Sequence, residues 1–182
     1  ENIYKKIKIF KSNGINKDAK SKIYPFDLFY DQVSVGYNFN MSDINASLGL
    51  SQLNKLDDFI KKRNDLALIY KKYLKNLPID FQNIDTNNYS SYHLFIILLN
   101  KNKKRKNRNN LFEFLKKNLI ATNLHYIPLY NHSIFKQNSF NRKNFINSEN
   151  YFNNALSIPL HQKLYKKDIV YISDKIKYFL NE

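Results

Sequence analysis

Cysteine and tryptophan are absent from the 182-residue sequence, and glycine and proline are scarce, with three and four residues. Without cysteine the chain can form no disulfide and no cysteine-ligated metal cluster, and it has no thiol nucleophile. Average usage would give about 13 glycines, so glycine-rich nucleotide-binding loops are excluded. No apolar run reaches the ~18 residues of a membrane span, and no signal-peptide pattern opens the chain. These absences predict a cytoplasmic protein without a membrane partner.

Basic residues outnumber acidic ones by 30 to 15, which gives a formal charge of +15. A charge of this size raises the possibility of a nucleic-acid partner. Most of the basic residues are lysines, however, whereas specific readers of nucleic acids rely on arginine. Lysine, asparagine, isoleucine, tyrosine and phenylalanine are plentiful and have A/T-rich codons, so nucleotide bias explains the composition at least as well. The densest basic run, residues 101–108, is interpreted as a solvated connecting loop, with a phosphate-binding patch as the alternative.

Apolar residues at intervals of three and four predict helices in the first part of the chain. One helix occupies the first residues and ends before Gly14, which is expected to adopt a positive φ. A long helix, capped by Ser42 or its neighbour, continues to Leu77–Pro78. Gly49 lies inside this helix and is expected to mark a bend or a close packing contact. Residues 15–37 are expected to form a loop or short strands.

Beyond this helix, short apolar runs alternate with helical patterns. The expected strands and extended segments, the last of which contains a proline, are residues 92–99, 122–127 and 156–160. The expected helices are residues 109–118, 148–155, with Ser148 as the cap, and 166–180. The predicted fold class is therefore α/β, with long helices packed against a small, mostly antiparallel sheet.

Histidines are the natural candidates for acid–base chemistry, but their spacing fits no metal site. His93 lies on a buried-looking strand and is interpreted as a hydrogen-bonded core residue. His125 and Tyr126 end a predicted strand, and strand ends are where sites accumulate in α/β folds. These two residues form a candidate site, and a purely structural role is the alternative.

A second candidate site is the segment 36–43, in which Asn38 and Asn40 precede the capped start of a helix. Free N–H groups and the helix dipole at such a position suit an anion such as phosphate. The alternative is an ordinary polar turn that caps a long helix.

Those segments also carry a family resemblance. Residues 36–64 (GYNFNMSDINASLGLSQLNKLDDFIKKRN) resemble a block of the DegT/DnrJ/EryC1/StrS sugar aminotransferases. Further blocks of that family follow the same order in FKSNGI, YHLFIILL, LHYIPLY and SENYFNNALSIPLHQKL. The nearest branch by this resemblance aminates a UDP-linked 4-keto-6-deoxy sugar on the way to pseudaminic acid, for cell-surface glycans.

The resemblance implies an aminotransferase of fold type I that depends on pyridoxal 5'-phosphate and is normally a homodimer. Such an enzyme transfers an amino group from glutamate to a nucleotide-linked sugar. Residues 1–37 would end the large cofactor domain and lead into the small domain, residues 38–182. By the same resemblance, Asn38 would contact the cofactor phosphate of the neighbouring subunit together with Asn40, and His125, Tyr126 and Asn13 would serve the nucleotide-sugar substrate.

The sequence also departs from the family pattern. The family has arginine at the position of Asn40 and histidine at that of Asn13, so phosphate or substrate binding would be weaker unless another cation takes over. The family's Schiff-base lysine precedes a Gly-Gly pair, and this sequence has no such pair. We therefore expect a C-terminal fragment that has no catalytic residue of its own and is inactive alone.

Two other functions remain open at this stage. The chain could be a basic module that binds nucleic acid or another polyanion, which would show as steeply salt-dependent binding. It could also be a degenerate, non-catalytic paralogue of the aminotransferases, as the residues Asn40 and Asn13 suggest.

Overall fold

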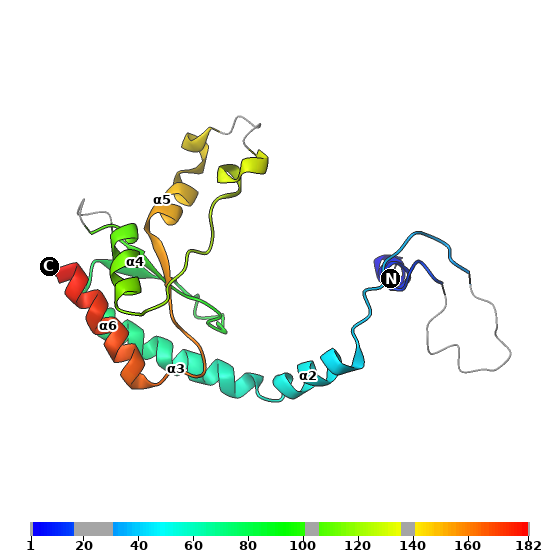
Figure 1. The fold of residues 1–182 in the computed structure, drawn as a ribbon, viewed down its shortest axis with the longest axis horizontal. Helices are drawn as coiled ribbons and strands as arrows, with labels where there is room; N and C mark the ends of the chain where they lie inside the picture. The colour runs from blue at the N-terminus through cyan, green and yellow to red at the C-terminus, as the bar shows by residue number, and fades with distance from the viewer. Residues whose placement is uncertain (1, 17–30, 101–105, 136–140, 182) are drawn as a thin grey trace. The chain divides into compact units, whose positions relative to one another are not determined.

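The computed structural model describes residues 2–16, 31–100, 106–135 and 141–181 (Figure 1). Most of the basic run and most of the expected loop before Ser42 lie outside these residues. The chain divides into two compact units, Glu1–Asn54 and Lys55–Glu182. Each unit is described by itself.

The first unit begins with helix α1 (Asn2–Phe10), followed by a tight turn. Gly14 has φ +76° in this turn, as expected. A Cβ at Gly14 would overlap the backbone of Ser34, and a Cβ at Gly36 would overlap the backbone of Gly14. The two glycines therefore allow two stretches of backbone to approach each other more closely than any side chain would permit.

Backbone pairing holds the end of α1 against the segment before the next helix. Ser12 and Asn38 form an isolated antiparallel bridge, and the amide of Phe39 donates to the carbonyl of Lys11 at 2.9 Å. The rings of Phe10, Tyr37 and Phe39 pack together, with Tyr37 stacked on Phe39 at 5.2 Å. Hydrogen bonds and aromatic contacts together hold the end of α1 against residues 37–39.

Helix α2 (Asp43–Leu53) is capped as expected, since the Ser42 hydroxyl accepts from the amide of Asn45 at 3.4 Å. The single long helix of the sequence prediction is wrong: α2 ends at Leu53, and helix α3 begins at Leu56. The apolar period runs through Leu53 and Leu56 and therefore gave no sign of the break at residues 54–55. The close packing contact expected at Gly49 is absent among the described residues, since a Cβ there would meet nothing within 4 Å.

The second unit is built on an antiparallel sheet in the order β1-β2-β3, with β1 (Ile79–Phe81), β2 (Phe95–Leu99) and β3 (Ala155–Ile158). Ile97 of β2 lies opposite Phe81 on one side and Leu156 on the other. Alternate residues of β2 are buried, as the period of a strand requires. The small antiparallel sheet of the sequence prediction is confirmed.

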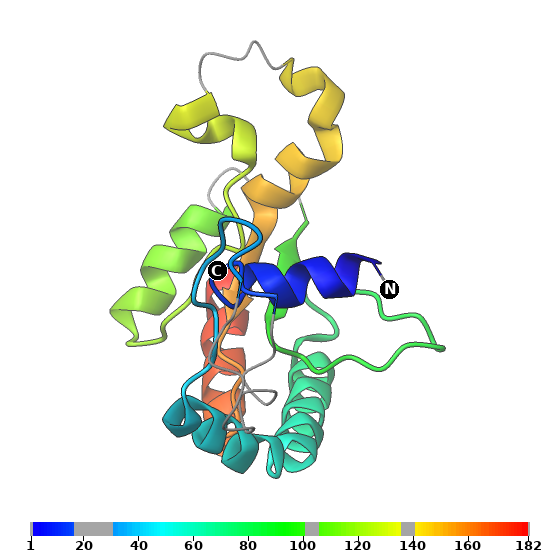
Figure 2. The ribbon, with the colours of Figure 1, turned by 90° about the vertical axis from the view of Figure 1, so that its right-hand side faces the viewer.

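Helices cover this sheet. Helix α3 (Leu56–Leu74) packs against α6 (Lys166–Asn181), and α4 (Arg108–Lys117) packs against α6 and β3. Figures 1 and 2 both show α6 beside α3, with the sheet next to them. Helix α5 (Ile146–Asn154) leads directly into β3 and contacts β2. Mostly aliphatic side chains from the three helices and the sheet form one core, which includes the fully buried Tyr70.

Three local expectations in the second unit are wrong. Residues 122–127 form no strand, and only Asn123 makes an isolated bridge, to Ser157. Ser148 does not cap α5, which begins at Ile146 after the short 3-10 helix η4 (Arg142–Phe145). His93 is exposed, because β2 begins only at Phe95. The strand at 122–127 fails because a single residue pairs there, whereas the other two fail because α5 begins two residues earlier and β2 three residues later than expected.

Among the residues described, no helix is both long enough and apolar enough to cross a membrane.

The glycines of the first unit provide a stability test. We expect Gly14→Ala to destabilise the turn by about 1–2 kcal/mol or more, because φ is positive there and the new methyl group would meet backbone. Gly49→Ala is the control, since it lies in a helix with open space around it and should stabilise by about 0.5–1 kcal/mol. Hydrogen exchange at the Tyr37 and Phe39 amides measures the effect. Equal protection in both variants would contradict this account of the turn.

Candidate functional site

The residues predicted for function fall into two groups. Asn13, Asn38 and Asn40 lie in the first unit, where backbone pairing brings them together, and His125 and Tyr126 lie in the second. Each group is built by its own local structure.

Asn13 lies in the glycine turn after α1 and has φ +59°. Its amide donates to the carbonyl of Tyr37 at 3.0 Å, and its own carbonyl accepts from the side chain of Gln32 at 2.8 Å. Asparagine tolerates the left-handed region better than most residues. The backbone of Asn13 therefore stabilises the turn, while its side chain is exposed.

Asn38 and Asn40 form a small polar cluster with Lys11. The Asn38 side-chain oxygen accepts from the Asn40 amide nitrogen at 3.4 Å and from Asn40 Nδ2 at 3.2 Å. Lys11 Nζ donates to Asn40 Oδ1 at 3.2 Å. The oxygen atoms of both side chains are thus used within the cluster, whereas Asn38 Nδ2 has no acceptor among the described residues. A cluster that presents N–H groups and one ammonium fits a phosphate group, which accepts hydrogen bonds.

In the second unit, His125 is held by β3. Its Nδ1 lies 2.8 Å from the hydroxyl of Ser157. Ser157 is 6% exposed, and its hydroxyl has no other partner among the described residues. A buried hydroxyl proton needs an acceptor, so we infer that Ser157 donates to Nδ1 and that the neutral imidazole carries its proton on Nε2. Nε2–H is then available to donate to an oxygen of a bound molecule.

Tyr151 of α5 holds the backbone of the same residue. Its hydroxyl donates to the His125 carbonyl at 2.9 Å, across a chain separation of 26 residues. Burial raises the pKa of Tyr151 above its ordinary value, which keeps the phenol neutral and able to donate. The ring and the backbone of His125 are therefore held by two separate elements, β3 and α5.

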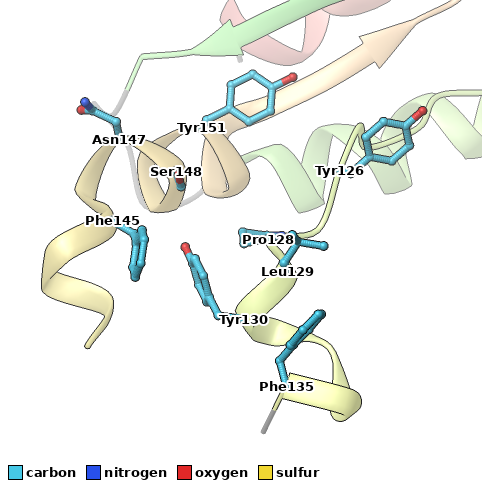
Figure 3. A pocket seen from close by; sticks show the side chains of 9 residues that line it. All are labelled: Tyr126, Pro128, Leu129, Tyr130, Phe135, Phe145, Asn147, Ser148 and Tyr151. Carbon is cyan, nitrogen blue, oxygen red and sulfur yellow. The ribbon is translucent and has the colours of Figure 1, made fainter. Parts of the chain in front are cut away.

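A cavity of about 690 Å³ opens beside Tyr126 and is shown in Figure 3. Its walls come from the segment after Tyr126, the short 3-10 helices η2 (Leu129–Asn131) and η3 (Ser133–Phe135), η4 and α5. Most of the lining residues are aromatic or apolar: Tyr126, Pro128, Leu129, Tyr130, Phe135, Phe145, Asn147, Ser148 and Tyr151. Ligand pockets range over roughly 300–1,000 Å³, mostly apolar with few polar groups, and this cavity has those properties.

Two of the lining rings, Tyr130 and Phe145, stack on each other in the wall of the cavity (Figure 3), with centroids 5.0 Å apart at 28°. Burial raises the pKa of the Tyr130 hydroxyl, and the charge of Glu149 acts in the same direction, while Arg142 opposes them. Tyr130 is therefore a neutral phenol, and the two rings offer flat faces for a planar group.

His93 was predicted to be a core residue, but it is exposed and lies near His125. It lines a smaller cavity of about 330 Å³ together with His125, Ser157 and Thr122. No group of three or more His, Asp or Glu side chains that could hold a metal ion occurs among the residues described.

Sequence reasoning missed five residues that these sites use: Lys11, Ser157, Tyr130, Tyr151 and Phe145. All but Phe145 lie inside a block that the sequence analysis singled out (FKSNGI, LHYIPLY or SENYFNNALSIPLHQKL). Their roles depend on contacts with residues 20 or more positions away in most cases, as for Lys11 and Asn40, which are 29 apart. The sequence identified the blocks, but it did not show which residues of different blocks contact each other.

The sequence matches the DegT/DnrJ/EryC1/StrS aminotransferase family over residues 1–177. It is 34% identical over 178 residues to the UDP-4-amino-4,6-dideoxy-N-acetyl-beta-L-altrosamine transaminase of Campylobacter jejuni, and the match covers 97% of this chain and 45% of that protein. The chain therefore spans about half the length of this relative.

Solved sugar aminotransferases have the same fold. Spr1654 from Streptococcus pneumoniae, a putative sugar aminotransferase in its PMP form, matches with a TM-score of 0.88 and 31% identity, over 99% of this chain and 45% of that one. It has also been solved in a PLP form. Helicobacter pylori PseC, an aminotransferase involved in the biosynthesis of pseudoaminic acid, matches with a TM-score of 0.82 and 27% identity, over 100% of this chain and 47% of that one. The family resemblance, the fold class and pyridoxal phosphate as the family's cofactor are confirmed.

The contact between Ser157 and His125 predicts a tautomer shift. In the neutral imidazole we expect the proton on Nε2, and Ser157→Ala should raise the Nδ1–H share about fivefold, since a neutral hydrogen bond contributes ~1 kcal/mol. The ¹⁵N chemical shifts of the His125 ring measure the ratio. Ser148→Ala, which removes a hydroxyl that lines the large cavity instead, should leave it unchanged. An unaltered ratio in Ser157→Ala would show that Ser157 does not orient the ring.

Proposed function

The chain belongs to the DegT/DnrJ/EryC1/StrS aminotransferase family, and we propose that it is the C-terminal part of a nucleotide-sugar aminotransferase that uses pyridoxal phosphate. The proposed reaction moves an amino group from glutamate to a UDP-linked 4-keto-6-deoxy sugar. The product would serve a pathway of the pseudaminic acid type in cell-surface glycan synthesis. The similarity to the Campylobacter jejuni transaminase and to PseC supports this substrate class.

The observation that carries the proposal is the aromatic cavity that Tyr126 lines, next to His125 in the chain. A nucleotide sugar has a planar base, which stacks on aromatic faces, and oxygen-rich sugar and diphosphate groups, which accept hydrogen bonds. The stacked pair of Tyr130 and Phe145 offers an aromatic wall, and the Nε2–H of His125, which lines the smaller cavity, offers a donor. In this proposal His125 and Tyr126 line the substrate entrance, and the base or sugar occupies the cavity.

Pyridoxal phosphate, when bound, supplies the electron sink on which amino transfer depends. The residues of this chain bind and orient rather than react. We propose that Asn38 and Asn40 donate to the cofactor phosphate, with Asn38 reaching the neighbouring subunit of a homodimer, and that Asn13 faces the substrate. No lysine of the sequence precedes a Gly-Gly pair, so in this proposal the Schiff-base lysine belongs to the other half of the enzyme.

The domain boundary and the location of the enzyme are also part of this proposal. Residues 1–37 would end the cofactor domain, and residues 38–182 would form the small domain. The compact units divide later, after Asn54. The exposed apolar side chains of α2, among them Ile44 at 83% and Leu50 at 63%, would then be covered by the rest of the enzyme. Glutamate and nucleotide-linked sugars are metabolites of the cytoplasm, where we expect the enzyme to act.

Kinetics of the full-length enzyme that contains this chain test the proposal. We expect glutamate and a UDP-linked 4-keto sugar to give 2-oxoglutarate and the amino sugar. Tyr130→Ala should raise KM for the keto sugar by about tenfold, because base stacking is worth ~1–3 kcal/mol, and leave the half-reaction with glutamate unchanged. Equal loss in both half-reactions would show that the cavity does not hold the nucleotide sugar.

A control variant and one further outcome sharpen this experiment. Leu68→Ala changes an exposed side chain of α3, 64% exposed and outside the cavity, and should leave both half-reactions unchanged. Full-length protein that binds pyridoxal phosphate but transfers no amino group from glutamate would contradict the proposed activity. That result would favour the degenerate paralogue suggested by Asn40 and Asn13.

A further inference from the structure

Lys11 occupies a position that the backbone of the first unit determines. It follows the last residue of α1, and its carbonyl accepts from the amide of Phe39 at 2.9 Å. The neighbouring amide of Tyr37 donates to the Phe10 carbonyl at 2.8 Å. This pairing brings Lys11 next to the segment that carries Asn38 and Asn40, although 29 residues separate Lys11 from Asn40.

The other segment of the pair alternates between aromatic and polar residues. Tyr37 and Phe39 stack with an interplanar angle of 10°, and both pack against Phe10. Successive side chains of an extended segment point to opposite faces, so Asn38 and Asn40 lie on the face away from this aromatic cluster. The aromatic contacts therefore keep both amides turned outward.

Among the described residues, both side-chain oxygens of the cluster are occupied within it, and donors remain for a ligand. One proton of the Lys11 ammonium goes to Asn40 Oδ1 at 3.2 Å, which leaves two for a ligand. Asn38 Oδ1 is occupied by Asn40, so the Nδ2 group of Asn38 remains to donate. Among the residues that the structure describes, no carboxylate pairs with Lys11. One positive charge beside two side-chain amides is a donor set for a phosphate monoester.

We propose that Lys11 supplies the positive charge of the phosphate site, in place of an arginine at position 40. This inference rests on the proposed function, since it assigns a further residue to the same cofactor site. Asn40 has no charge of its own, but it holds the Lys11 ammonium through its side-chain oxygen and leaves its nitrogen to orient Asn38. A lysine acts as a point charge and not as a planar fork, so the two asparagines provide the directional contacts.

Direct binding measurements on the full-length apoenzyme test this assignment. Equilibrium dialysis gives the Kd for pyridoxal phosphate, and calorimetry gives the Kd for inorganic phosphate as a simpler probe. We expect Lys11→Met, which keeps the aliphatic stem, to weaken both affinities by about tenfold, because hydrogen bonds to charged groups are the strong ones. Lys11→Arg should remain within about threefold of the unmodified enzyme.

Two further variants test whether the effect of Lys11→Met comes from the charge at the site. One controls for the net charge of the protein, and the other controls for loss of folding. Lys6→Met removes one charge from exposed α1 and should leave both affinities unchanged. The double variant Lys11→Met with Asn40→Arg should recover most of the lost affinity, because it returns a cation to the same cluster. Recovery would also show that the Lys11→Met protein is folded.

The possible outcomes distinguish this inference from the proposed function. Unchanged Kd values in Lys11→Met would overturn the role of Lys11 and leave the aminotransferase proposal standing. If the unmodified protein bound no pyridoxal phosphate, the proposed function would fail, and the phosphate titration would still decide whether Lys11 belongs to an anion site. Equal weakening by Lys6→Met would show a general effect of net charge and overturn the assignment.

Discussion

The pairing of β3 with β2 is the interaction on which the second unit depends. β3 is buried at all four positions, so it belongs to the core on both faces. Ser157 lies opposite Ile96 of β2 and also bridges to Asn123. The same residue holds the ring of His125. A shift of one residue in this register would turn Ser157 to the other face of the sheet, and His125 would lose its partner. Core packing and site geometry are therefore set by the same strand.

Tyr70 links this strand to the helices. It is fully buried, stacks on Phe95 of β2 at 5.0 Å, and donates to the Pro159 carbonyl just after β3. Burial raises the pKa of its hydroxyl, and the charge of Asp168 adds to this effect, so Tyr70 stays neutral and keeps donating. One side chain of α3 thus contacts β2 and the end of β3 together. β3, which holds His125 through Ser157, is therefore connected through Tyr70 to α3, and α3 packs against α6.

The first unit relies on a different constraint, which is close backbone approach at Gly14 and Gly36. Its polar cluster is exposed, and it is organised by backbone pairing and three aromatic rings instead of a core. The second unit offers an open apolar cavity with few donors, whereas the first offers exposed N–H groups and an ammonium. The two kinds of surface suit the two parts of a proposed chemistry, a nucleotide sugar and a phosphate-bearing cofactor.

Local pattern was sufficient for the family, the fold class, the helices α4 and α6, the Ser42 cap and the positive φ of Gly14. It was sufficient because caps, apolar periods and glycine conformations depend on neighbours in the chain. The sequence alone also determined that Asn38, Asn40, His125 and Tyr126 are the residues to examine. Tertiary structure decided the contacts at these sites: Lys11 beside Asn40, Ser157 beside His125, and Tyr130 stacked on Phe145 in the wall of a cavity. It also exposed His93 and removed the expected strand at 122–127. These outcomes depend on pairing and burial between distant segments, and no local window of sequence contains both partners of such a contact.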